Sequence, residues 1–346
     1  MRALSTTSSV FLQFARIACA SAVVFCLSAA TARAATIGPI TFGPTDYDNT
    51  ANTVTDPGAV QHLNQTFGLF RDVFWWSARN SAVGVGSPDY INRGNSLVLV
   101  NNHAVPGTGP YTALNFTGNS PSGGQSYMAV YDTTPGNIAP RDVFDASQGL
   151  TISADVLFAH DGHSVSAGVV AMYNEGQDAL TLVAHQGGGN NPDHARLELV
   201  FQSAGVGTLL LSSADLPGTT SFVAAEWYQI TMNLSVSGDA WTMNGTIQDH
   251  VDPTNPNSAV AATIANLVFA GSLSNPGNTL DLTNPGEIGV IAQANQAFAD
   301  AIPDPLNPTV DNIGVSITNF TAVPEPASLS LLSMGLVVLA AMRRRR

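Results

Sequence analysis

Short stretches of alternating apolar and polar residues recur through the middle of the chain, separated by clusters of Gly, Pro, Asn and Asp. Residues 150–158 (LTISADVLF) and 195–201 (ARLELVF) both place apolar side chains at every second position. Because successive side chains of a β-strand point to opposite faces of a sheet, this period predicts half-buried strands. Further strands are expected at 70–76, 96–100, 126–131, 166–173, 179–184, 207–212, 287–293 and 312–320.

Residues 227–236 (WYQITMNLSV) carry the clearest alternation, and a Ser-Gly-Asp turn follows them at 237–239. The apolar face of this strand comprises Tyr228, Ile230, Met232, Leu234 and Val236. After the turn, apolar side chains alternate again with polar ones, at Trp241, Met243 and Ile247 against Thr242, Asn244 and Thr246. The pattern predicts a β-hairpin with one buried and one solvated face. Only residues 258–270 and 291–301 have a pattern compatible with a helix.

Many short strands and little helix predict an all-β protein, an antiparallel β-sandwich of the jelly-roll type spanning residues 35–321. Four segments resemble strands of concanavalin A-like (laminin-G-like) jelly rolls: GLTISADVLF, AAEWYQITMNLSV, EIGVIAQA and TVDNIGVSITNF. The resemblance implies that fold. Its members include binding modules, glycosidases and lyases, so the fold alone does not select a function.

Residues 1–34 have the features of a cleavable signal peptide. Arg2 and Arg16 give a positive start, and residues 17–30 (IACASAVVFCLSAA) form an apolar run too short to span a bilayer comfortably. Ala32 and Ala34 are the small residues that signal peptidase requires before its cleavage site. Both cysteines of the chain lie in this segment, so the mature protein is expected to have no disulfide and no thiol nucleophile.

The C-terminal segment, residues 322–346, has three ordered parts. A Pro-Glu-Pro motif comes first, the uncharged run 327–342 (ASLSLLSMGLVVLAAM) is marginally long enough to span a membrane, and four arginines close the chain. The residues of the motif and of the basic end are Pro324, Glu325, Pro326, Arg343, Arg344, Arg345 and Arg346.

This order resembles the PEP-CTERM sorting signal of Gram-negative bacteria that make extracellular polysaccharide. The resemblance implies that an exosortase-like protease in the membrane recognises Pro-Glu-Pro and that the tail is removed. The chain is therefore expected to cross the inner membrane, to be held there by its C-terminal segment before processing, and to reach the cell surface or extracellular matrix.

The net negative charge of the chain limits the kinds of molecule that it can bind. The chain has 12 basic residues, all arginine, against 25 acidic ones. Seven arginines and one carboxylate lie in the two terminal segments, which leaves five arginines against 24 carboxylates in the domain between them. So negative a domain repels phosphate backbones, which excludes nucleic-acid binding, and it favours divalent cations.

No catalytic pattern stands out. Residues 35–321 contain four glutamates, none close to another, and lack the Glu-x-Asp-x-x-Glu string of hydrolases with this fold. Arg196-Leu197-Glu198-Leu199 resembles the Arg-x-Glu-Leu strand of alginate lyases, but the chain has no lysine and neither a Gln-Ile-His nor a Gln-Val-His strand. We therefore interpret Arg196 and Glu198 as a solvent-facing charge pair. His185 and His194 flank a Gly-rich loop, and we interpret them as solvated rather than as metal ligands.

Calcium is the cofactor that the sequence favours. Asp311 precedes the last expected strand, and Asp46 and Asp48 lie near the start of the mature chain. Carboxylate and carbonyl oxygens are the ligands that Ca²⁺ takes in proteins. The resemblance to jelly rolls implies a Ca²⁺ ion that joins the two ends of the domain, with capping of turns by these aspartates as the alternative.

Three tryptophans are candidates for stacking on sugar rings. Trp75 and Trp76 are adjacent and should point to opposite faces of a strand, and Trp227 lies on the polar face of its own strand. The sequence thus favours a non-enzymatic surface or matrix protein that binds exopolysaccharide. Two alternatives stay open: a polysaccharide lyase or hydrolase, and a structural or adhesive coat protein.

Overall fold

The computed structural model describes the chain in segments. The described residues are 36–42, 66–67, 70–77, 98–101, 111, 113–118, 125–133, 142–158, 165–173, 179–186, 195–203, 206–213, 216, 222–272, 282, 285–294, 302–303 and 312–324. Two compact units divide the chain, one comprising Thr36–Val323 and the other Met1–Ala35 with Pro324–Arg346.

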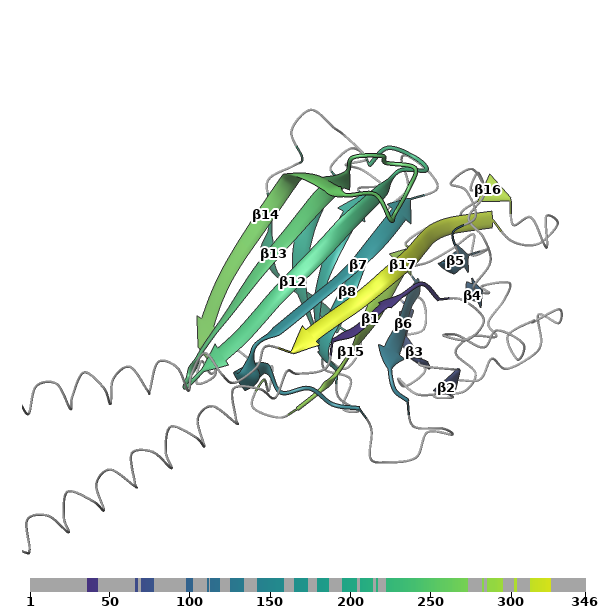
Figure 1. Cartoon of the computed structure of the whole chain (residues 1–346). Helices are drawn as coiled ribbons and strands as arrows, with labels where there is room; N and C mark the ends of the chain where they lie inside the picture. Colours follow the sequence, from purple (N-terminus) through teal and green to yellow (C-terminus); the bar gives the residue numbers. More distant parts are fainter. Residues whose placement is uncertain are drawn as a thin grey trace, which may run out of the picture. The chain divides into compact units, whose positions relative to one another are not determined.

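In the described part of the chain, the unit Thr36–Val323 contains two antiparallel sheets (Figure 1). Sheet A has nine strands. In spatial order they are β14 (Val260–Ser272), β13 (Ala240–His250), β12 (Trp227–Ser237), β7 (Leu150–Phe158), β17 (Asn312–Pro324), β5 (Leu114–Gly118) and β4 (Val98–Asn101), while β1 (Ile37–Ile40) and β16 (Ile302–Pro303) also pair with β17.

Sheet B has eight strands among the described residues. In spatial order they are β11 (Val206–Ser212), β10 (Arg196–Ser203), β9 (Ala179–Gln186), β8 (Val165–Tyr173), β15 (Glu287–Ala294), β6 (Gln125–Tyr131), β3 (Phe70–Ser77) and β2 (Thr66–Phe67). The helical structure in the described residues is one short 3-10 turn, Ala146–Gln148. The expected all-β antiparallel sandwich is therefore confirmed.

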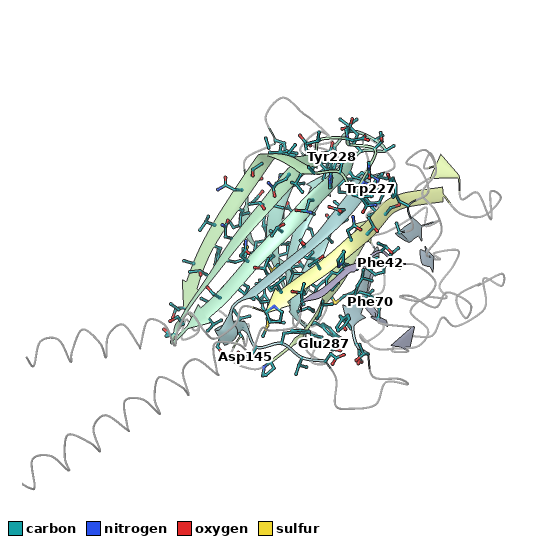
Figure 2. All side chains as sticks on the ribbon, viewed as in Figure 1. Phe42, Phe70, Asp145, Trp227, Tyr228 and Glu287 are labelled. Atoms are coloured by element: carbon teal, nitrogen blue, oxygen red, sulfur yellow. The ribbon has the colours of Figure 1, made fainter. Side chains whose placement is uncertain are left out.

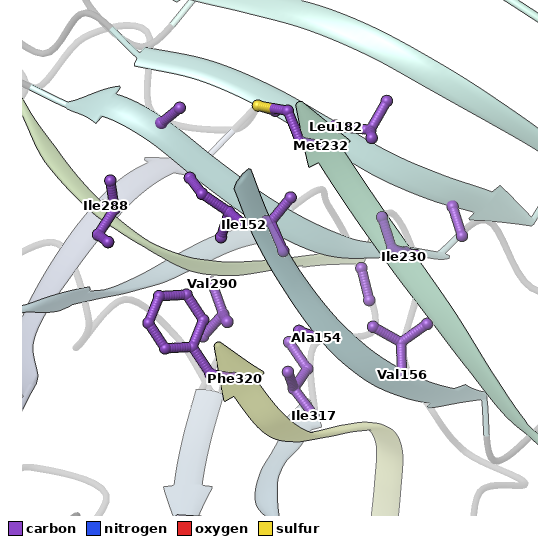
Figure 3. Close-up of a cluster of buried hydrophobic side chains, with 14 of the residues drawn as sticks. Ile152, Ala154, Val156, Leu182, Ile230, Met232, Ile288, Val290, Ile317 and Phe320 are labelled. Carbon is purple, nitrogen blue, oxygen red and sulfur yellow. The ribbon is translucent and has the colours of Figure 1, made fainter. Parts of the chain in front are cut away.

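The core lies between the two sheets and uses the side chains that the alternation assigned to it. On β7 the inward residues Ile152, Ala154 and Val156 are fully buried, and on β12 the same holds for Ile230 and Met232. Figure 3 shows these side chains meeting residues of sheet B and of β17. Each fully buried aliphatic side chain of this kind contributes about 1.5–3 kcal/mol to folding.

The hairpin β12–β13 forms in the expected register, with Met232 opposite Gly245 and Ser237 opposite Ala240. Gly238 occupies the turn with a positive φ of 60°, a conformation that glycine adopts without strain. The polar face of the hairpin is exposed to solvent, as the exposed side chains Ser235 and Thr242 show. These two side chains hydrogen-bond to each other across the hairpin at 2.8 Å.

The prediction of a possible helix at 258–270 is wrong. Residues Val260–Ser272 form β14, an edge strand of 13 residues that pairs with β13 along most of its length. Phe269 packs on Trp241 of β13, with ring centroids 4.8 Å apart, and this tertiary contact outweighs the helical preference of an alanine-rich segment. Of the second candidate helix, Ile291–Ala294 belongs to β15 and the described part shows no helix there.

Candidate functional site

A row of polar residues crosses the outer face of sheet B, the face turned away from the core. Strand pairing places Arg196 of β10 opposite His185 of β9, and His185 opposite Ser166 of β8. These positions alternate with the core residues Leu197, Ala184 and Ala167, which explains why the sequence directs them outward. We call these three residues with Glu198 the sheet B polar cluster.

The backbone pairing of sheet B continues from Ser166 to Gln293 of β15, from Gln293 to Ser126 of β6, and from Ser126 to Trp76 of β3. The row whose side chains are described comprises Arg196, His185 and Ser166, on three adjacent strands. Because neighbouring strands lie about 4.8 Å apart, this row extends over about 10 Å.

Direct contacts hold the sheet B polar cluster together. Arg196 Nε donates to Glu198 Oε1 at 2.6 Å, and Ser166 Oγ lies 2.7 Å from His185 Nδ1. Glu198 is buried, whereas the side chains of Arg196 and His185 are 32% and 17% exposed. The expected charge pair is present, but the expectation that it faces solvent is wrong for Glu198. The buried carboxylate fixes the guanidinium, whose other N–H groups can donate to a ligand.

His185 is held in its neutral form. Burial lowers the pKa of its imidazole; the charge of Glu198 opposes this shift, and the charge of Arg196 adds to it. Ser166 and Glu198 both approach the same ring nitrogen, Nδ1, at 2.7 Å and 3.8 Å. A serine–histidine–carboxylate triad uses the two different ring nitrogens, so this arrangement does not activate Ser166 as a nucleophile.

An apolar patch borders the polar row on the same face. Val183 pairs with Glu198 and with Gly168. It lies two residues from His185 on β9, and Gly168 lies two residues from Ser166 on β8, so all four are on the same face. The members of this patch are all buried: Met128, Val130, Val170, Tyr173, Ala179, Val183 and Ile291. Because all of these side chains are buried, the patch itself offers no surface to a ligand.

A second polar cluster lies on the outer face of sheet A and is fully enclosed. Asp155 of β7 and His250 of β13 are both buried, and His250 Nε2 lies 3.0 Å from Asp155 Oδ1. Asn319 of β17 donates to Asp155 Oδ2 at 2.8 Å and to the carbonyl of Pro256 at 3.0 Å. These bonds tie the segment 251–259 to three strands, so the cluster has a structural role.

The hydrogen bonds of His250 favour its protonated form. Its second ring nitrogen, Nδ1, lies 3.2 Å from the carbonyl oxygen of Ser258, so only the doubly protonated ring can donate on both sides. Burial lowers the pKa of His250, but the hydrogen bond and charge of Asp155, the Ser258 carbonyl and the charge of Asp249 outweigh burial and raise it above 6.5.

We expect the contribution of His250 to stability to fall with rising pH. Because its pKa is higher in the folded than in the unfolded chain, its stabilisation is complete below about pH 6.5 and is lost as the pH rises through the folded-state pKa. Urea midpoints of the wild type and of His250→Asn, followed from acidic to alkaline pH, should therefore converge. A gap that stays constant would show that His250 has the same pKa in the folded and the unfolded chain.

Trp227 is not a stacking platform, so that expectation is wrong. Its side chain is fully buried and packs with Ala113 and Leu157, and its backbone N–H donates to the carbonyl of Pro253 at 2.8 Å. The alternation assigned it correctly to the outer face, but other residues cover it there. Trp75 and Trp76 lie in β3, where the register shifts between Phe74 and Trp76, and their side chains are outside the description.

The other expected site residues also lie outside the described residues, except Pro324. These are Ala32, Ala34, Asp46, Asp48, Asp311, Glu325, Pro326 and Arg343 to Arg346, and His194 of the histidine interpretation. Within the described ranges no group of three or more His, Cys, Asp or Glu residues could hold a metal ion. Nor does any helix there have the length and apolar character needed to cross a bilayer; the expected span at 327–342 is outside those ranges.

Comparison with known proteins identifies the C-terminal segment. Residues 322–346 match the PEP-CTERM protein-sorting motif, which confirms the sorting signal expected there. The chain is therefore an exported, surface-destined protein that carries this motif C-terminal to an antiparallel β-sandwich. No curated protein matches the sequence.

Solved structures similar to the chain include two plant lectins and a phage protein. Lectin II from Ulex europaeus is 11% identical, with 67% of this chain and 93% of that chain covered and a TM-score of 0.38. Lectin I from Ulex europaeus, solved with the methyl glycoside of α-L-fucose, is 10% identical, with coverages of 67% and 94% and a TM-score of 0.37. A tailspike protein from an Escherichia coli O157:H7 bacteriophage is 13% identical, with coverages of 78% and 27% and a TM-score of 0.33.

Proposed function

We propose that this protein is a non-enzymatic component of the cell surface or extracellular matrix that binds exopolysaccharide through the outer face of sheet B. The observation that carries the proposal is the pair of partly exposed side chains Arg196 and His185 on the outer face of sheet B, with Arg196 held by the buried Glu198. Arg196 supplies a charged donor for the hydroxyl or carboxylate groups of a sugar chain. The sequence adds Trp76 as a candidate for stacking on a sugar ring.

The proposal includes sorting by an exosortase-like protease after signal peptidase has removed the leader. The motif at 322–346 supports this partner, and the Gram-negative inner membrane is the barrier that the chain crosses. The domain then reaches the same compartment as the secreted polysaccharide. The negative charge of the domain keeps nucleic acid outside the range of proposed ligands.

We expect Arg196→Gln and Trp76→Ala each to weaken binding of the host's purified exopolysaccharide by about tenfold, equivalent to about 1.4 kcal/mol. Titration calorimetry on folded protein measures the effect. Thr242→Ala, on the exposed face of sheet A, is the matched control and should bind as the wild type does. Wild-type protein that binds no exopolysaccharide would contradict the proposal and favour a structural or adhesive coat protein.

Polysaccharide cleavage by β-elimination is the second candidate function, and one observation favours it. The neutral imidazole of His185 can accept a proton, and it pairs across β9 and β10 with Arg196, whose charge suits a uronate carboxylate. Formation of unsaturated uronate that is lost in His185→Asn would establish a lyase. Binding without product supports the first function.

We further propose that Ca²⁺ binds Asp311 together with Asp46 or Asp48, on the strength of the sequence pattern alone. Calcium at a hundredfold excess over its Kd should then stabilise the domain by about 2.7 kcal/mol. Magnesium should stabilise it less, because its strict octahedral geometry suits flexible oxygen ligands poorly. Thermal unfolding with calcium, magnesium or chelator measures the effect, and a Tm that chelator leaves unchanged would contradict the site.

A further inference from the structure

The sorting motif begins inside the folded sandwich. Strand β17 extends to Pro324, so the first three residues matched by the motif, Ala322 to Pro324, are strand residues of sheet A. Ala322 is fully buried, and Val323 and Pro324 are half-buried. No linker separates the last strand from the Pro-Glu-Pro sequence.

The start of the mature chain holds this last strand in place. β1 begins at Ile37, three residues after Ala34, and pairs with β17 through Ile37 opposite Ala322 and Ile40 opposite Phe320. The chain then continues into the core at Phe42, which is fully buried and packs on Phe70 with ring centroids 4.8 Å apart (Figure 2). Phe70 in turn contacts Phe320 at 5.6 Å.

The approach of β1 to β17 requires a glycine. A Cβ atom at Gly38 would lie 2.2 Å from the carbonyl oxygen of Phe320, and the φ of Gly38 is +88°. Both the close backbone contact and the left-handed conformation exclude other residues. Next to this contact, Asn319 is bonded to the buried Asp155. Peeling β17 away would expose Phe320 and Ala322 and remove a donor from Asp155.

We propose that the sorting protease acts on the folded domain, with β1 docked on β17, and reads the motif outward from Pro324. Folding of the sandwich and docking of the N-terminal strand then precede removal of the tail. This inference rests on the sorting step of the proposed function. Gly38, Ile37 and Ala322 are positioning residues in it, because they hold the strand in which the motif begins.

Locking the two strands together tests one half of the proposal. Paired residues of antiparallel strands have Cα atoms about 4.5–5.5 Å apart, within the range of about 4.4–6.8 Å that disulfides span. The mature chain has no cysteine, and the periplasm is oxidising, so I37C/A322C should form one disulfide. Intact-mass measurement of chains from the native host should show the tail removed from this variant as fully as from the wild type, I37C and A322C.

Releasing the strands tests the other half. Gly38→Ala should raise the ratio of unprocessed to processed chain by about tenfold, because it forces β1 off β17. Gly238→Ala is the matched control: that glycine also has a positive φ, of 60°, but a Cβ there meets nothing within 4 Å. Its ratio should equal that of the wild type.

Each contrary result would contradict one step of this proposal. A tail retained only in the disulfide-locked variant would show that β17 must peel away before cleavage. Free thiols in that variant would show that the strands are not paired, and normal processing of Gly38→Ala would show that docking is not needed. A tail retained by the wild type itself would refute the sorting step, a result that none of the others gives.

Discussion

Asp155→Ala is expected to lower the free energy of unfolding by about 3–5 kcal/mol, because it leaves the buried imidazolium of His250 without a counter-charge. Both side chains are almost completely enclosed, and 3.0 Å separates their bonded atoms. The amide of Asn319 also loses its acceptor on β7. Urea unfolding below the pKa of His250 measures the loss.

Ser153→Ala is the control for this variant. Ser153 lies two residues before Asp155 on the same face of β7 and is half-buried, so its loss should change stability by about 0.5 kcal/mol or less. The double variant Asp155→Ala/His250→Ala should recover part of the stability, because it removes the stranded charge. A loss below about 1 kcal/mol for Asp155→Ala alone would mean that the pair is hydrated or uncharged.

Ile230→Ala is expected to cost about 2–5 kcal/mol through lost burial and the cavity that remains. Ile230 is fully buried on β12, a central strand, opposite Ala154 of β7 and Ile247 of β13 (Figure 3). Packed neighbours on both sides leave little room for the site to collapse. The midpoint of urea unfolding provides the measurement.

Thr231→Ala provides the comparison on the opposite face of the same strand. Thr231 is half-buried and pairs with Ser153 and Thr246, so its truncation should cost well under 1 kcal/mol. Equal losses for the two variants would mean that both faces of β12 are buried. A larger loss for Thr231→Ala would mean a register shifted by one residue, which exchanges the faces.

Local alternation predicted best the strands that bury one face, because only these separate apolar from polar positions. It placed β7, β12 and β13 correctly, together with the face that each turns inward. It failed at β14, where an alanine-rich segment has no strong local preference and the strand forms because β13 offers a partner. The short β1 has no legible alternation, since four residues carry no measurable period.

The candidate site was less accessible to sequence reasoning. Arg196 and Glu198 were recognisable as a pair, because their spacing puts both on one face of a strand. Their alignment with Ser166 and Gln293 depends on which strands are neighbours in sheet B, and alternation says nothing about that. Trp227 was assigned to the correct face of its strand, but alternation does not reveal which other residues cover that face.

The buried pair of Asp155 and His250 was missed altogether. Its two residues lie 95 positions apart, on strands that are separated by β12 in sheet A. The signal in the sequence was a single carboxylate in the middle of a strand with a strongly apolar face. Such a carboxylate needs a partner when it is buried, and the partner cannot be named before the topology is known.

The central position of β17 in sheet A has a kinetic consequence. β17 lies between β7 and β5 and also pairs with β1, and one of its contacts, from Thr318 to Thr41, joins residues 277 positions apart. Chains dominated by such distant pairings fold slowly, because a long loop must close before the contacts form. In a chain that emerges from its N-terminus, β7 and β5 each keep one open edge until β17 is available. The sandwich therefore closes last, around its C-terminal strand.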